Sequence, residues 1–195
     1  MTTAAAVPES ALRTDEGTSR LVVASIAIGI VGLVGLGISG TFFTTSSGAH
    51  FDHTADYWLT ASGLPIAVGT VGTLLAVHWR QRGADGRLGA VGTWLGVLAM
   101  VELFVQLSAS VLTSTEQQWG PSYILFTGLA FVGHALLAAG SWRTGVMPRW
   151  MLGVWPLLWV LGSFAAVAGP LPLLLIAFYV ALGAVMERRG TSQSL

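Results

Sequence analysis

Six long apolar stretches divide this chain into seven polar segments, and the basic residues are confined to alternate segments. The chain has no lysine, and its arginines lie before the first stretch and after the second, the fourth and the sixth. Basic residues in short loops stay on the cytoplasmic side when a membrane protein inserts. The pattern therefore predicts an all-α membrane bundle of six transmembrane helices, with both termini in the cytoplasm. The arginines are Arg13, Arg20, Arg80, Arg82, Arg87, Arg143, Arg149, Arg188 and Arg189.

The lengths of the apolar stretches define a single domain. A helix needs about 20 apolar residues to cross a bilayer, and six such helices with short loops use most of the 195 residues. We expect the six-helix transmembrane domain over 21–187. Residues 1–20 mix acids, arginines and small polar residues, which predicts a disordered cytoplasmic tail, and 188–195 form a second cytoplasmic tail. The predicted helices cover about 21–43, 58–78, 88–112, 121–142, 150–168 and 170–186.

Composition restricts the partners and the chemistry of the chain. Hydrophobic residues make up 53% of it and charged residues only 9%, so we expect a lipid bilayer around it, with the arginines at anionic headgroups. The formal net charge is zero, which gives no reason to expect a nucleic-acid partner. Without cysteine there is no thiolate nucleophile, and without lysine there is no Schiff base. Basic residues that are all arginine, together with abundant alanine, glycine and valine, are typical of a GC-rich bacterial genome. We therefore expect the cell inner (plasma) membrane.

Small residues recur along one face of the first apolar stretch. Such residues let two helix backbones approach closely inside a membrane. We interpret this face mainly as a packing surface for a neighbouring helix. An alternative is that it docks the chain, as an accessory subunit, against a membrane protein partner or a second copy. The residues of this face are Ser25, Gly29, Gly32, Gly35 and Ser39.

Glu102 is the only acid inside the apolar stretches, and it is expected near the middle of the third helix. A carboxylate at that depth is costly unless it is neutralised, hydrogen-bonded or in contact with a wet cavity. With a rise of about 1.5 Å per residue, Glu102 should lie level with Thr127 of the fourth helix, and Gln106 level with Tyr123. His134 belongs to the same stripe of the fourth helix, roughly 9 Å nearer the cytoplasm.

This polar cluster admits three interpretations. In the structural one, a protonated Glu102 is hydrogen-bonded to Thr127 or to a carbonyl group and holds two helices together. In the leading functional one, Glu102, Gln106, Tyr123, Thr127 and His134 contribute to a pocket that binds or moves a small lipophilic ligand. The third is a membrane-embedded enzyme for an isoprenoid or lipid, with Glu102 as general acid and His134 or Tyr123 assisting. The lack of a second buried carboxylate, of a phosphate-binding loop and of an Asp-rich metal motif argues against catalysis.

Histidines raise the question of metals and cofactors. His50 and His53 are three residues apart in the first outer loop, and Asp56 follows them, so the three side chains are candidate metal ligands. Haem needs two axial histidines at matched depth. Because His78 is expected at the end of one helix and His134 deeper in another, no haem or other cofactor is predicted.

Two short patterns resemble a known family. Residues 143–153 read RTGVMPRWMLG, with Pro, Arg and Trp before a helix that contains glycine, and the pair Val101-Glu102 lies within the third predicted helix. Both are similar to features of a family of small bacterial polytopic membrane proteins, known mainly as a domain of unknown function. The likeness covers roughly residues 63–186. It implies a bundle of six to seven helices and no assigned activity.

Overall fold

The computed structural model describes residues 9–46, 49–81, 83–117, 121–165 and 171–191. Within these ranges the chain is all-α, as predicted, with one isolated β-bridge between two loops. Four of the helices, in the segments Gly17–Phe42, Thr54–Arg80, Gly86–Thr113 and Pro121–Ser141, are long and apolar enough to cross a membrane. The helices are α1 (Glu9–Phe42), α2 (Thr54–Arg80), α3 (Gly86–Thr113), α4 (Pro121–Ser141), α5 (Arg149–Ala165) and α6 (Leu171–Thr191).

The helix boundaries differ from the predicted ones chiefly at the two termini of the chain. α1 begins at Glu9 and not at Leu21, so the expectation of disorder over 1–20 is wrong for 9–20. Acidic residues near the start of a helix interact favourably with its dipole, and extending an existing helix costs far less than nucleating a new one. α6 likewise continues past Met186 to Thr191. Residues 166–168, assigned to the fifth helix by the sequence, lie outside the described residues.

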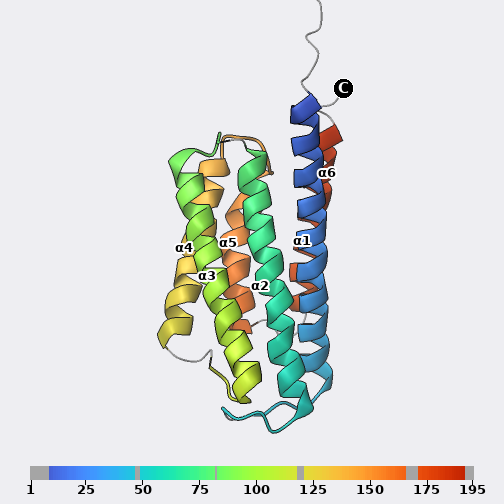
Figure 1. Cartoon of the computed structure of the whole chain (residues 1–195), viewed down its shortest axis with the longest axis vertical. Coiled ribbons are helices and arrows are strands. Elements are labelled where there is room, and N and C mark those ends of the chain that lie inside the picture. The colour runs from blue at the N-terminus through green and yellow to red at the C-terminus, as the bar shows by residue number, and fades with distance from the viewer. Residues whose placement is uncertain (1–8, 47–48, 82, 118–120, 166–170, 192–195) are drawn as a thin grey trace, which may run out of the picture.

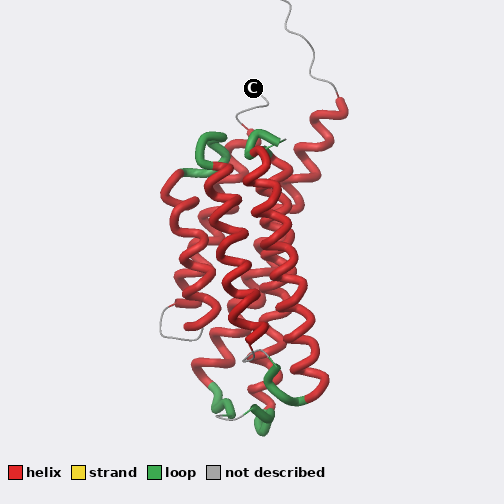
Figure 2. The backbone as a smooth tube through the Cα atoms, turned by 90° about the vertical axis from the view of Figure 1, so that its left-hand side faces the viewer, coloured by secondary structure: helices red, strands yellow, loops and turns green. Residues whose placement is uncertain are grey.

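The six helices form an antiparallel bundle in which neighbours in sequence are neighbours in space (Figure 1). Each helix packs against the next, and α6 returns to pack against α1, which closes the ring. The connections lie only at the two ends of the bundle (Figure 2). The start of α1, the end of α6 and the α2–α3 and α4–α5 connections share one end (Figure 1). The arginines of the described residues all belong to these segments, and we call this end the arginine end.

The hairpin of α1 and α2 is packed through glycine. A Cβ atom added to Gly32 would lie 2.6 Å from the carbonyl oxygen of Ser62, and one added to Gly69 would lie 2.5 Å from that of Ser25. Only glycine permits this backbone approach. The packing role predicted for the small residues of the first helix is therefore confirmed. Since α2 occupies this face, the face is not available to dock a partner protein.

The hairpin of α3 and α4 is built in the same way. A Cβ atom on Gly92 would lie 2.6 Å from the carbonyl oxygen of Gly133, and one on Gly133 would lie 2.5 Å from the backbone nitrogen of Gly96. Both hairpins therefore keep their helix axes close over the middle of the bundle. In the second hairpin the helices also carry the polar residues that the sequence singled out.

The largest hydrophobic core lies toward the arginine end. Trp155 and Met151 of α5 pack there against Leu74 of α2, Leu137 of α4 and Leu182 of α6. A second, smaller cluster lies further from that end, where Ala99, Met100 and Ala130 bring α3 and α4 together. The half of the bundle opposite the arginine end thus has a smaller buried apolar cluster among the described residues.

Polar contacts join the helices at the arginine end. His78 Nδ1 lies 2.6 Å from Oδ2 of Asp85, which links the end of α2 to the turn before α3. The side-chain amide of Gln81 donates a hydrogen bond to Ser141 Oγ of α4 at 2.8 Å. In the connection that carries these residues, Gly83 has a φ of 83°, a conformation that favours glycine.

The opposite end is closed by two paired loops. His50 and Thr115 form an antiparallel bridge, and the Phe51 amide donates to the carbonyl of Ser114 at 3.0 Å. The Tyr57 hydroxyl donates to Ser114 Oγ at 2.6 Å. The α1–α2 loop is therefore attached to the α3–α4 loop across α2 and α3.

Candidate functional site

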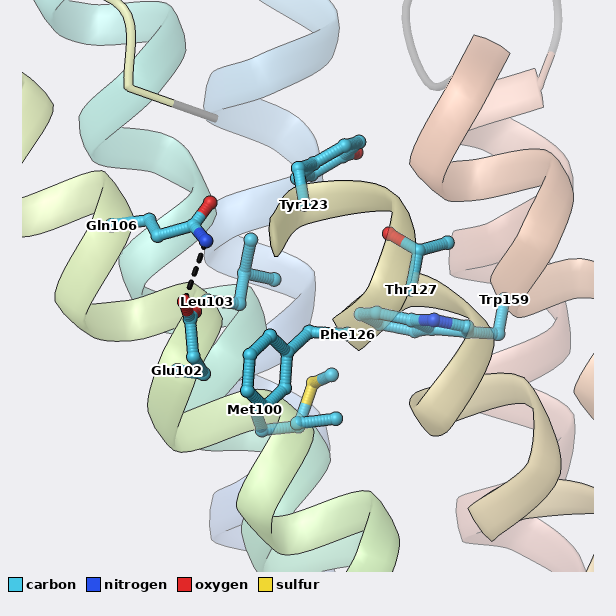
Figure 3. Close-up of a pocket in the computed structure, with 9 residues that line it drawn as sticks. Met100, Glu102, Leu103, Gln106, Tyr123, Phe126, Thr127 and Trp159 are labelled. Atoms are coloured by element: carbon cyan, nitrogen blue, oxygen red, sulfur yellow. Dashed lines mark hydrogen bonds between the residues drawn. The ribbon is translucent and has the colours of Figure 1, made fainter. Parts of the chain in front are cut away.

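A pocket lies between α3, α4 and α5 in the half of the bundle away from the arginine end (Figure 3). It encloses about 250 Å³ of empty space, part of which belongs to its open side. Only about one water molecule's volume of this space is enclosed, so a larger occupant would lie partly in the open side of the pocket. The lining residues are Ala99, Met100, Glu102, Leu103, Gln106, Tyr123, Phe126, Thr127 and Trp159.

The structure brings four of the residues chosen from sequence to this one pocket: Glu102, Gln106, Tyr123 and Thr127. The helix register expected from the rise per residue is confirmed, because the Gln106 amide donates to Ser122 Oγ of α4 at 3.0 Å. Their role in ligand binding stays a prediction.

The partner of Glu102 differs from the expected one. The amide of Gln106, one turn along the same helix, donates to Glu102 Oε1 at 2.6 Å (Figure 3). We expected a bond to Thr127 or to a carbonyl group on the facing helix. Side chains four residues apart lie on one face of a helix, so Gln106 reaches the carboxyl group without any adjustment of the backbone.

Two buried oxygen atoms at the pocket accept no hydrogen bond. They are Oε2 of Glu102 and Oε1 of Gln106. A buried acceptor without a donor costs roughly 1–3 kcal/mol, and more when it carries charge. Gln106 is only 8% exposed, so bulk solvent contacts its amide little. A ligand that donates hydrogen bonds would remove this cost.

Aromatic rings form much of the remaining wall. Tyr123 and Phe126 come from α4, and Trp159 comes from α5 (Figure 3). Phe126 and Trp159 were not predictable from the sequence, because an aromatic residue in an apolar stretch has no signal that separates it from core packing. Only the packing of α5 on α4 places the indole at the pocket.

His134 does not line the pocket, although the sequence analysis grouped it with the other four residues. It is fully buried, and its Nδ1–H donates to the carbonyl of Ala130 at 2.7 Å. The imidazole stacks on Trp159, with centroids 5.5 Å apart, and meets the edge of Trp155. His134 lies seven residues, or about 10 Å, from Thr127 along α4. It is therefore nearer the arginine end than the pocket is, and it contacts the Trp159 ring that lines the pocket.

The candidate metal ligands of the outer loop are not brought together. The Asp56 carboxylate accepts hydrogen bonds from the Ser46 amide at 2.8 Å, the Ser46 hydroxyl at 2.6 Å and the His53 amide at 2.9 Å. Its oxygens therefore hold the loop in shape, while His50 pairs with Thr115. No group of three His, Asp or Glu side chains suited to a metal occurs within the residues that the structure describes. The metal hypothesis has no geometric support.

No protein-family model matches the chain, and no curated protein or solved structure is significantly similar to it. The family resemblance over residues 63–186 thus remains a prediction from sequence. The function has to be inferred from the pocket itself.

Proposed function

We propose that this chain is a six-span membrane protein with both termini in the cytoplasm, and that it binds or moves a small lipophilic ligand through the pocket between α3, α4 and α5. The topology is supported by four helices compatible with membrane spans and by α5 and α6, which lie antiparallel beside them (Figure 1). The arginines of the described residues share one end, which fits a cytoplasmic face.

The observation that carries the proposed function is the combination of free acceptors and apolar walls in one pocket. Glu102 and Gln106 each keep a buried oxygen without a donor. Met100, Leu103 and Trp159 line the same pocket with apolar surface. Binding sites for small molecules commonly have a few placed polar groups within a mainly apolar lining. The ligand that fits has an apolar body and one group that donates hydrogen bonds.

Binding is favoured over catalysis by the residues that line the pocket. Glu102 and Tyr123 are the only lining side chains able to exchange a proton. His134, the assistant considered for an enzyme, lies outside the pocket behind the Trp159 ring. A general acid without a second group to activate water or a nucleophile supports few reactions.

A matched pair of substitutions on α3 tests this function. Leu103→Phe fills the pocket, whereas Leu98→Phe makes the same change on a face of α3 where the side chain is 53% exposed. The proteins are purified in mild detergent, and their organic extracts are compared by mass spectrometry. We expect a small apolar compound in the wild type and in Leu98→Phe that is depleted in Leu103→Phe.

Two results would contradict the proposal in different ways. Identical extracts from the three proteins would show that the pocket retains no ligand. Conversion of the retained compound into a product by the wild type, but not by Glu102→Gln, would establish the enzyme instead.

A further inference from the structure

The pocket acid has no basic partner within the described chain. Glu102 is about 22 Å from Arg87 along the axis of α3, and the other arginines of the described residues belong to the same end as Arg87 (Figure 1). Its hydrogen-bond partner is the neutral amide of Gln106. In a candidate membrane span, a carboxylate paired only with an amide is costly. The charge would therefore be neutralised by a proton or by a cation from outside the described residues.

The hydrogen bonds around Glu102 determine which ligand group can approach. A side-chain amide has two N–H donors, and those of Gln106 go to Glu102 Oε1 and to Ser122 Oγ. The free atoms of this pair are both oxygens, Glu102 Oε2 and Gln106 Oε1. The pair therefore attracts a positive or donating group and repels an anion.

The aromatic wall favours the same kind of group. The faces of Tyr, Phe and Trp rings attract organic cations, most strongly where water is excluded. Tyr123, Phe126 and Trp159 line the pocket together with Glu102 (Figure 3). A carboxylate that shares a pocket with aromatic rings is suited to an ammonium group carrying apolar substituents.

We propose that the lipophilic ligand is an organic ammonium ion, which pairs with the Glu102 carboxylate in exchange for a proton. This rests on the proposed function and specifies its ligand class. In the empty pocket a proton on Glu102 removes the charge. When the ammonium ion enters, the carboxyl O–H bond breaks, the proton leaves to water, and the carboxylate pairs with the cation. No covalent bond to the ligand is formed, and charge is conserved.

The exchange is tested by calorimetry on the full chain in an uncharged maltoside detergent. The probes are benzyltrimethylammonium and neopentylbenzene, which have the same shape and differ in charge. Titrations in two buffers of different ionisation enthalpy give the protons released per ligand bound. We expect about one proton to be released for each ammonium ion bound, and none for neopentylbenzene.

Two variants distinguish the effect of the Glu102 charge on binding from an effect on folding. Glu102→Gln should abolish ammonium binding and proton release, while neopentylbenzene still binds. Asp52→Asn removes an exposed acid from the loop end and should behave as wild type in both titrations. Thermal unfolding of each variant confirms that the comparison is made between folded proteins.

Each outcome of these titrations supports or contradicts the exchange of a proton for the ammonium ion. Equal affinity for the two probes, ammonium binding without proton release, or wild-type binding by Glu102→Gln would overturn the exchange. If only neopentylbenzene binds, and Leu103→Phe blocks it, the pocket for a lipophilic ligand stands and the ammonium assignment falls. If neither probe binds the wild type, the ammonium assignment falls, and the extract comparison of Leu103→Phe decides the proposed function independently.

Discussion

Two acids, one in each half of the bundle, differ in what lies next to them. Asp85 at the arginine end has a side chain without solvent exposure and is paired with His78 at 2.6 Å. Glu102, in the opposite half, is bonded only to the amide of Gln106 and faces a pocket. The first acid has a basic partner within the fold, which indicates a structural role. The second has no basic partner among the described residues, and we propose that a ligand binds there.

The polar contacts and the apolar cores around the two acids also differ. At the arginine end, Gln81 bonds Ser141 across two helices, and the largest apolar core lies beside this cluster. Around Glu102 the core is small, and the helices leave space. Each acid keeps one buried oxygen without a hydrogen-bond donor, which is costly to folding, but only Glu102 lines the pocket. We therefore expect substitutions at Asp85 to affect stability and those at Glu102 to affect binding.

The largest expected effect concerns the sides of the membrane on which the two ends lie. The chain has no cysteine, so single cysteines can be placed at Ala84, near the arginine end, and at Gln117, in the opposite loop. Both positions are exposed. In intact cells an impermeant maleimide should label Gln117→Cys and leave Ala84→Cys unlabelled until the membrane is permeabilised. Labelling of both in intact cells would refute the six-span topology.

The next effect concerns the paired acid. Asp85→Asn should lower the free energy of unfolding by about 1–3 kcal/mol, because it disrupts the short hydrogen bond between Asp85 and His78. The measurement is unfolding in mixed detergent micelles, with His78→Gln and the double variant completing a cycle. A coupling energy below about 0.5 kcal/mol would show that the pair does not hold the α2–α3 turn.

The smallest effect on stability is expected at the acid that faces the pocket. Glu102→Gln should change the unfolding free energy by less than about 1 kcal/mol, because a neutral amide replaces an oxygen that had no donor. The same unfolding assay measures it. A loss as large as that of Asp85→Asn would mean that Glu102 is a structural anchor, as in the first interpretation of the sequence.

The candidate site was only partly predictable from sequence. Glu102 is conspicuous as a single acid in an apolar stretch, and the helix rise was enough to place Gln106 opposite the start of α4. The partner of Glu102 was not predictable in this way, because several donors lay within reach. His134 was misplaced, since a stripe on one helix does not say how far a pocket extends along it. Trp159 was not predicted, because the position of its indole at the pocket depends on how α5 packs against α4.

By itself the sequence determined the helices, their approximate bounds and the distribution of the arginines, because hydrophobic length and charge act locally along the chain. The close packing of α1 on α2 was also predictable from the sequence, because it depends on small residues along one face of α1. Only the tertiary structure decided that α3, α4 and α5 enclose a pocket, and that its two oxygens lack donors. Those properties depend on contacts between side chains of different helices, whose distances no local pattern fixes.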